Sequence, residues 1–109
     1  MKLPYADQAV VEEAKLTEYL LSPSHPQGHS KAYFFGRLGS DREHPDLLGQ
    51  ALLHLARTTD MQESVSPYGT KFVGVGTLHS PTGREARVAT VWILKAGEPP
   101  PILVTAYPS

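Results

Sequence analysis

The sequence predicts an α+β fold in which three short N-terminal helices pack on an antiparallel β-sheet meander of three to four strands. Apolar residues recur with helical spacing in the first half of the chain and alternate with strand spacing in the second half. Helices that precede strands in this way are typical of α+β proteins. The 109 residues suit a single domain over 1–109, with a helical part at 1–60 and a sheet part at 68–109.

Three segments carry the helical pattern. The helices are expected over these ranges: 12–22, 31–38 and 45–57. In the first, Leu16, Tyr19 and Leu20 follow i, i+3, i+4 spacing and form one apolar face. Ser30 is placed to cap the second helix, and Pro45 suits the first turn of the third.

The second half of the chain alternates and is rich in β-branched residues. The strands are expected over these ranges: 70–80, 84–95 and 102–107. A fourth strand is expected around residues 8–11, and residues 58–67 are expected to form a polar loop. The G-V-G stretch of Gly74 and Gly76 indicates a close backbone approach or a bulge.

Composition and charge exclude several classes of protein. The chain has no cysteine, which excludes disulfides, thiolate zinc sites and cysteine nucleophiles. It has no apolar run that could span a membrane and no signal-peptide core, so we expect a cytoplasmic protein, although the lack of cysteine does not exclude export. The net charge of −1 differs from the basic balance of a strong nucleic-acid binder.

The charge is nevertheless unevenly distributed along the chain. Residues 64–97 carry four cationic side chains and a single acid, Glu85, which predicts a local basic face. The alternative is ordinary scatter of charge on solvated strands, and it is the simpler interpretation.

The stretch S-H-P-Q-G-H-S-K holds the main chemical candidates. His25 titrates near neutral pH and can move protons, while Lys31 at a helix start suits a phosphate or a developing anion. The alternative is a tight H-P-Q-G turn with a solvated lysine. His25 and His29 are four residues apart, but Pro26 and Gly28 make this segment a loop without nearby carboxylates. We therefore expect no metal site, and no nucleotide motif predicts a cofactor.

The last predicted strand adds two polar side chains to these candidates. Thr105 and Tyr107 are two residues apart and therefore point to the same face. A polar group on a covered face needs a partner or a role. The alternative is that Tyr107 is an amphipathic strand end and that Thr105 and Thr90 are simply good strand residues. Trp92 is expected in the core.

Four motifs occur in order along the chain: H-P-x-G-x-x-K, Y-G-x-K-[FY], G-R-x-A-x-V-x-T-x-W-I and T-A-Y. Together they resemble an uncharacterised bacterial domain family, and the resemblance covers nearly the whole chain. The positions that carry it are His25, Pro26, Gly28, Lys31, Tyr68, Gly69, Lys71, Phe72, Gly83, Arg84, Ala86, Val88, Thr90, Trp92, Ile93, Thr105, Ala106 and Tyr107. Related domains occur in small free-standing proteins, in phage head-associated proteins and at the C-termini of contact-dependent toxins. Those toxin tails are similar to the barnase–EndoU–colicin–RelE class of metal-independent ribonucleases.

The resemblance implies a small metal-independent endoribonuclease of toxin type, or a domesticated relative, that cleaves RNA through the 2′-hydroxyl without a cofactor. His25 would be the general base or acid, and Tyr107 would be its partner or would stack on a base. Lys31 would stabilise charge on the phosphorane, and Thr105 would donate to a phosphate oxygen. Substrate binding is assigned to four residues: Arg87, Thr90, Lys71 and Arg84.

The expected partners are RNA and a cognate neutralising protein, with no membrane and no metal. The neutralising protein is expected because the chain begins with Met, which predicts a free-standing protein. A free ribonuclease would poison its own cell unless a partner neutralised it. The alternative function is a non-catalytic protein-interaction module, contacted through exposed aromatics and the E-P-P-P edge. Catalysis requires the 25–31 segment to lie against the end of the last strand, whereas the interaction module does not.

Overall fold

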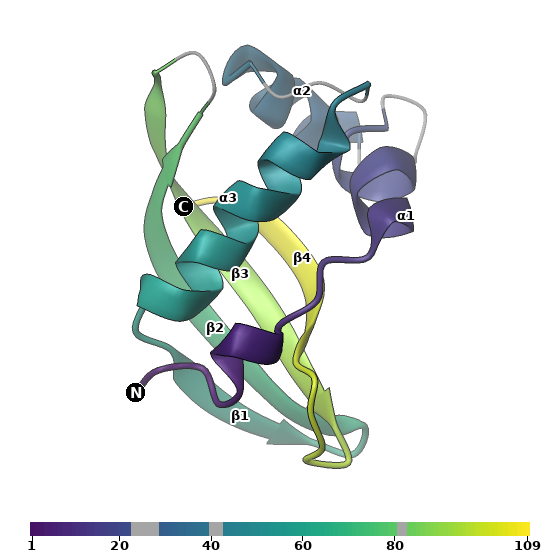
Figure 1. Cartoon of the computed structure of the whole chain (residues 1–109), viewed down its shortest axis with the longest axis vertical. Helices are drawn as coiled ribbons and strands as arrows, with labels where there is room; N and C mark the ends of the chain where they lie inside the picture. The colour runs from purple at the N-terminus through teal and green to yellow at the C-terminus, as the bar shows by residue number, and fades with distance from the viewer. Residues whose placement is uncertain (23–28, 40–42, 81–82) are drawn as a thin grey trace.

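The computed structural model describes residues 1–22, 29–39, 43–80 and 83–109, which form three helices and one four-stranded antiparallel sheet (Figure 1). The elements are η1 (Ala6–Gln8), α1 (Glu13–Lys15), η2 (Leu16–Leu20), α2 (His29–Arg37), α3 (Pro45–Thr58), β1 (Gln62–Ser66), β2 (Gly69–His79), β3 (Glu85–Lys95) and β4 (Ile102–Pro108). The predicted α+β class, with helices ahead of the strands, is confirmed. None of the helices in the described ranges combines the length and apolar character needed to cross a membrane.

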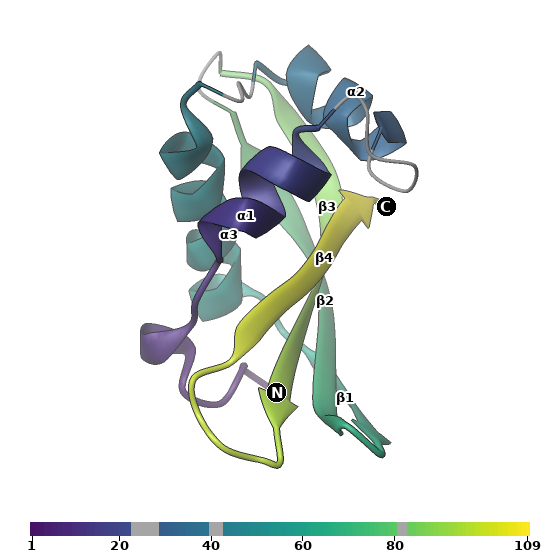
Figure 2. The ribbon, with the colours of Figure 1, turned by 90° about the vertical axis from the view of Figure 1, so that its right-hand side faces the viewer.

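The sheet is a meander in the order β1-β2-β3-β4, with each strand antiparallel to the next. The register between β3 and β4 shifts at Val91 and Trp92. The ribbon shows α3 lying along one face of the strands, and the turned view shows α2 near the end of β4 (Figure 2). We call the face that α3 covers the inner face and the opposite one the outer face.

The core lies between α3 and the inner face. The predicted leucine stripe of α3 is buried, and Leu52 is fully enclosed. Trp92 of β3 is also fully buried, and its indole N–H donates to the hydroxyl oxygen of Thr90 over 3.0 Å. No buried side-chain nitrogen or oxygen of the described residues lacks a hydrogen-bond partner. The core therefore satisfies the polar groups that it encloses.

The two glycines of the G-V-G stretch let β2 pass close to the end of α3. A Cβ atom at Gly74 would lie 2.6 Å from the sulfur of Met61 and 2.8 Å from the carbonyl oxygen of Asp60. A Cβ atom at Gly76 would lie 2.7 Å from the hydroxyl oxygen of Thr59. These distances are too short for real carbon atoms, so the predicted close backbone approach is confirmed.

Two sequence-based expectations about the strands need correction. The predicted polar loop at 58–67 contains β1, so the loop assignment is wrong for Gln62–Ser66. This strand lies at the sheet edge with most of its side chains exposed, so it lacks the apolar alternation by which strands are predicted. The N-terminal segment makes a single parallel bridge, between Val10 and Ile102, instead of a strand.

Candidate functional site

The structure brings two predicted site residues, Lys31 and Thr105, together around Tyr19. The phenol oxygen of Tyr19 lies 3.2 Å from the hydroxyl oxygen of Thr105, which is hydrogen-bonding distance. The Nζ atoms of Lys31 and Lys15 lie 5.1 and 5.2 Å from the centre of the Tyr19 ring. We call Lys15, Tyr19, Lys31 and Thr105 the Tyr19 cluster; its four members come from α1, η2, α2 and β4.

Local sequence explains the placement of Tyr19. Leu16 and Leu20 are buried and fix the orientation of η2 against the core. Tyr19 borders this apolar face and is half-buried, so its ring packs while its hydroxyl reaches β4. Lys15 precedes it by four residues, which places the two side chains next to each other on a helical turn.

The register of β4 explains why Thr105 is available to Tyr19. Ala106 pairs with the buried Thr90 and belongs to the inner face. Thr105 pairs with Val91 and therefore points to the outer face. α2 lies near this end of β4, and its first turn carries Lys31 (Figure 2).

The environment of Tyr19 makes its phenol more acidic than an ordinary tyrosine. Burial raises the pKa of this group, since it disfavours the charged form. The hydrogen bond with Thr105, the hydrogen bond and charge of Lys31 and the charge of Lys15 together outweigh burial and lower the pKa. A phenol with a lowered pKa is a better proton donor at neutral pH.

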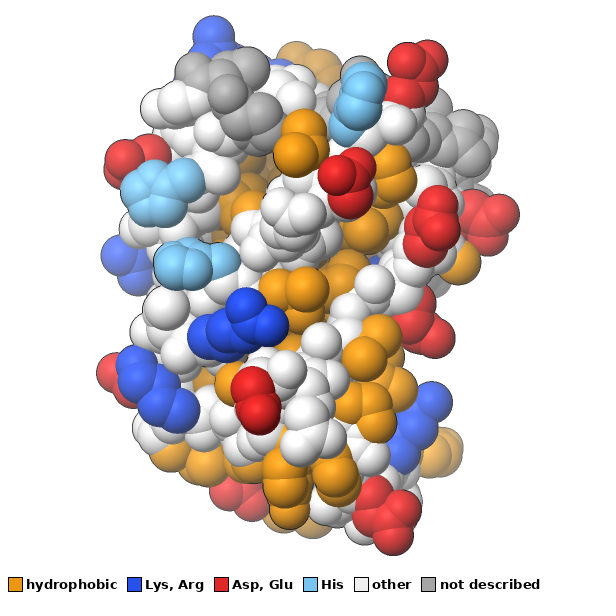
Figure 3. Space-filling model, in the orientation of Figure 1, with side chains coloured by type: hydrophobic (Ala, Val, Ile, Leu, Met, Phe, Trp, Pro, Cys, Tyr) orange, Lys and Arg blue, Asp and Glu red, His pale blue; other side chains and the backbone are white. Residues whose placement is uncertain are grey.

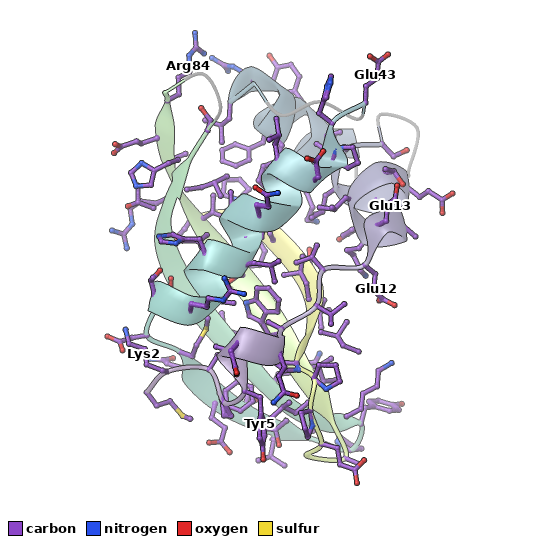
Figure 4. All side chains as sticks on the ribbon, in the orientation of Figure 1. Lys2, Tyr5, Glu12, Glu13, Glu43 and Arg84 are labelled. Atoms are coloured by element: carbon purple, nitrogen blue, oxygen red, sulfur yellow. The ribbon has the colours of Figure 1, made fainter. Side chains whose placement is uncertain are left out.

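Tyr19 and Lys15 border a surface hollow of about 410 Å³. Its other lining residues include two exposed carboxylates, Glu12 and Glu18. Glu12 projects outward from the start of α1 (Figure 4). An anionic ligand is therefore attracted from the side of the two ammonium groups and repelled from the side of these acids.

Two further predicted site residues lie on the same outer face as Thr105. Tyr107 is two residues further along β4 and is 39% exposed. It pairs with Ala89, and Arg87 is two residues before Ala89, so both side chains share the face of Thr105. Arg87 is exposed. The described residues provide no hydrogen bond to the side chain of Tyr107 or of Arg87.

The remaining predicted residues lie apart from the Tyr19 cluster. Thr90 is on the inner face, 1% exposed, and its hydroxyl accepts the Trp92 hydrogen bond. Lys71 is half-buried where β2 pairs with β1. Arg84 bonds through Nη1 to the carbonyl oxygen of Arg37 at 3.1 Å. His25 lies outside the described residues.

Sequence reasoning missed Tyr19 and Lys15 as site residues. Tyr19 fitted the apolar stripe of a helix, and that pattern says nothing about where a hydroxyl points. The available signal was the Lys15–Tyr19 spacing of four, which brings a cation to an aromatic ring on a helix. No group of three or more described histidine, aspartate or glutamate side chains is arranged to hold a metal ion.

Comparison with known proteins places this fold in context. The family described as Domain of unknown function (DUF6883) matches residues 2–109. No curated protein matches the chain. Among solved structures, the chain is similar to one from the contact-dependent growth inhibition toxin – immunity protein complex from Klebsiella pneumoniae 342, with 15% identity and a TM-score of 0.71. The match covers 96% of this chain and 97% of that chain, so the two share a fold over their whole length.

Proposed function

We propose that this chain, which belongs to the DUF6883 family, is a small metal-independent endoribonuclease of toxin type, or a domesticated relative of one. The observation that carries the proposal is the Tyr19 cluster, in which an acidified phenol and a threonine hydroxyl lie beside two ammonium groups. Donors and cations converging in this way suit a phosphodiester that gains negative charge during reaction. RNA in the cytoplasm is the substrate class that this site would meet.

The chemistry needs no metal, since RNA carries its own nucleophile. The 2′-oxygen forms a bond to phosphorus, and the bond from phosphorus to the 5′-oxygen breaks. A base takes the 2′-hydroxyl proton and an acid gives a proton to the leaving 5′-oxygen. The products are a 2′,3′-cyclic phosphate and a 5′-hydroxyl.

Each member of the cluster has a role in this scheme. Lys31 and Lys15 stabilise the charge that develops on the phosphorane oxygens. Tyr19 gives the proton to the leaving oxygen, for which its lowered pKa fits it. Thr105 holds the phenol in place through the 3.2 Å contact. The sequence left His25 as either base or acid; with Tyr19 as the acid we propose His25 as the general base, and Tyr107 as a stacking surface for a nucleobase.

The solved neighbour supports a place for this chain in a toxin–immunity system. It belongs to a complex between a contact-dependent growth inhibition toxin and an immunity protein. On this likeness we propose that this chain binds a partner protein, which for a toxin is a cognate neutralising protein. Such a partner would keep a free ribonuclease from degrading the RNA of the cell that makes it.

The test is cleavage of bulk tRNA by the purified protein in EDTA, with analysis of the product ends. We expect cyclic-phosphate ends, no cleavage at sites with a 2′-deoxy sugar, and loss of cleavage in Tyr19→Phe and in His25→Ala. The Tyr19→Phe protein, purified in parallel, is the control for contaminating nuclease. Cleavage equal to that background, or cleavage that survives the deoxy substitution, would exclude this mechanism.

A second candidate is a non-catalytic interaction module, favoured by exposed apolar side chains at one end of the molecule. Val65 and Tyr68, at the β1–β2 turn, are 79% and 82% exposed, and Tyr5 at the same end is 47% exposed (Figure 4). To test for such a partner, a photoreactive amino acid is placed at position 68 and crosslinked in the cell that makes the protein. The same amino acid at the exposed position 57 of α3 is the matched control. A discrete protein adduct from position 68 alone would support it, and equal adducts at both positions would oppose it.

A further inference from the structure

The outward side of α2 carries an aromatic ring stacked with a cation. Tyr33 is 70% exposed, and the guanidinium carbon of Arg37 lies 5.8 Å from the centre of its ring. The two residues are four apart, so they occupy the same side of the helix. The stacked guanidinium holds the exposed ring in a defined position.

A second guanidinium joins this pair from the sheet. Arg84, just before β3, donates through Nη1 to the carbonyl oxygen of Arg37 at the end of α2 (3.1 Å), and it lies at the tip of the β2–β3 hairpin (Figure 4). Its backbone N–H bonds to the Ser80 hydroxyl, which holds this end of the hairpin. An arginine has five N–H donors, and the described residues accept only this one from the Arg84 side chain. We call Tyr33, Arg37 and Arg84 the α2 patch.

The charge of α2 contrasts with that of the first helical segment. The sequence of α2, HSKAYFFGR, contains no acid and ends in a basic residue. α1 and η2 carry Glu13 and Glu18, and the acids gather on the α1 side of the face seen in Figure 3. A polyanion is therefore favoured at α2.

We infer that the α2 patch is a second contact for single-stranded RNA, outside the site of cleavage; this rests on the proposed ribonuclease function. A planar guanidinium fork matches a phosphate, and an exposed aromatic ring accepts any base by stacking. Lys31 and Tyr33 are two residues apart, so their side chains leave α2 on nearly opposite sides of a helix that is about 10–12 Å across. A strand cut at the Tyr19 cluster has to continue around α2 to reach Tyr33, and a dinucleotide is too short to do so.

Binding is measured by fluorescence anisotropy with a labelled single-stranded oligonucleotide whose sugars are all 2′-O-methyl, so that the probe cannot be cleaved. Tyr33→Ala is expected to weaken binding roughly five- to 150-fold, the factor given by ~1–3 kcal/mol of base stacking. Tyr33→Phe keeps the ring and is expected to keep the affinity. Arg37→Gln is expected to weaken binding and to lower the salt-dependence slope by about 0.7.

The controls are Tyr68→Ala, an exposed tyrosine at the opposite end, and Arg57→Gln, an exposed arginine on α3. Both are expected to bind as the wild type does. Equal binding by Tyr33→Ala and Tyr68→Ala would overturn the inference. Displacement of the probe by poly-glutamate as readily as by unlabelled RNA would also overturn it, by assigning the patch to an acidic protein.

Cleavage assays separate this inference from the proposed function. We expect Tyr33→Ala to raise KM for tRNA while leaving kcat and the turnover of a dinucleotide unchanged. If the wild type fails to cut RNA but binds the probe in a Tyr33-dependent way, the patch stands and the ribonuclease assignment falls. If RNA is cut and Tyr33→Ala changes neither KM nor binding, the patch falls and the ribonuclease assignment stands.

Discussion

Two threonines on neighbouring strands show how differently the two faces of the sheet use the same side chain. Thr90 on the inner face is 1% exposed, and its hydroxyl accepts the indole N–H of Trp92. Thr105 on the outer face is half-buried, and its hydroxyl meets a phenol flanked by two ammonium groups. One hydroxyl completes a sealed core, while the other belongs to a charged cluster beside solvent. We therefore expect Thr90 to act on stability and Thr105 on chemistry.

The largest expected effect lies on the outer face. Lys31→Met removes the ammonium group that hydrogen-bonds to the Tyr19 phenol and whose positive charge lowers the pKa of that phenol. We expect RNA cleavage to fall about 100- to 1000-fold, the usual loss when one charge-stabilising donor is removed. The urea midpoint of unfolding is expected to stay the same.

Lys95→Met is the control for this change, since Lys95 is an exposed lysine at the last residue of β3 and is assigned no role in the site. It is expected to cut RNA at the wild-type rate. An equal loss of RNA cleavage in both variants would mean that cleavage depends only on the net charge of the protein and not on the position of Lys31.

The next effect belongs to the inner side. Gly74→Ala places a Cβ atom against the Asp60 carbonyl oxygen, a backbone atom that cannot rotate away. The free energy of unfolding is expected to fall by about 1–3 kcal/mol, the range for overpacking. Urea unfolding measures it, with Gly36→Ala as the control because nothing lies within 4 Å of a Cβ atom there. A stable Gly74→Ala protein would contradict the close approach.

The smallest effect is spectroscopic. Of the five tyrosines, Tyr19 is expected to give a phenolate component that titrates below the ordinary tyrosine pKa. Ultraviolet absorbance against pH detects it. Lys31→Met is expected to raise this pKa, since the lysine lowers it, and Tyr19→Phe removes the component. A component that is the same in Tyr19→Phe would belong to another residue.

The sign of this shift also fixes its effect on stability. The folded state holds the Tyr19 phenol below its unfolded pKa of about 10. The phenolate therefore adds stability as pH rises through the lowered pKa, and that contribution is complete above the unfolded value. At pH values well below the lowered pKa the phenol is protonated in both states, and the shift contributes nothing there.

Much of the fold could be predicted because its elements carry strong local patterns. The third helix, expected over 45–57, is α3, and the three predicted strands correspond to β2, β3 and β4. β1 was not predicted because a polar edge strand buries few side chains, so its sequence lacks the alternation of apolar and polar residues that indicates a strand. Its pairing with β2 is set by the short turn between them, which the sequence shows only as Pro67 and Gly69.

The site was harder to predict than the fold. Lys31 and Thr105 are predicted site residues from their chemistry and from a family resemblance. The contact from Tyr19 of η2 to Thr105 of β4 spans 86 residues of sequence. It depends on how η2 packs beside β4, which no local pattern encodes. Thr90 was selected by the same strand reasoning as Thr105, and only the register shows that the two face opposite sides.

The most direct test of the account compares Thr105→Val with Thr90→Val, measuring RNA cleavage in EDTA and urea unfolding on each protein. Thr90→Val leaves the buried Trp92 N–H without an acceptor and is expected to lose about 1–3 kcal/mol of unfolding free energy while the folded protein cuts normally. Thr105→Val is expected to cut at least about tenfold more slowly at unchanged stability, since it frees the phenol that Thr105 holds. Wild-type cleavage by Thr105→Val would contradict the assignment of the Tyr19 cluster as the reactive site.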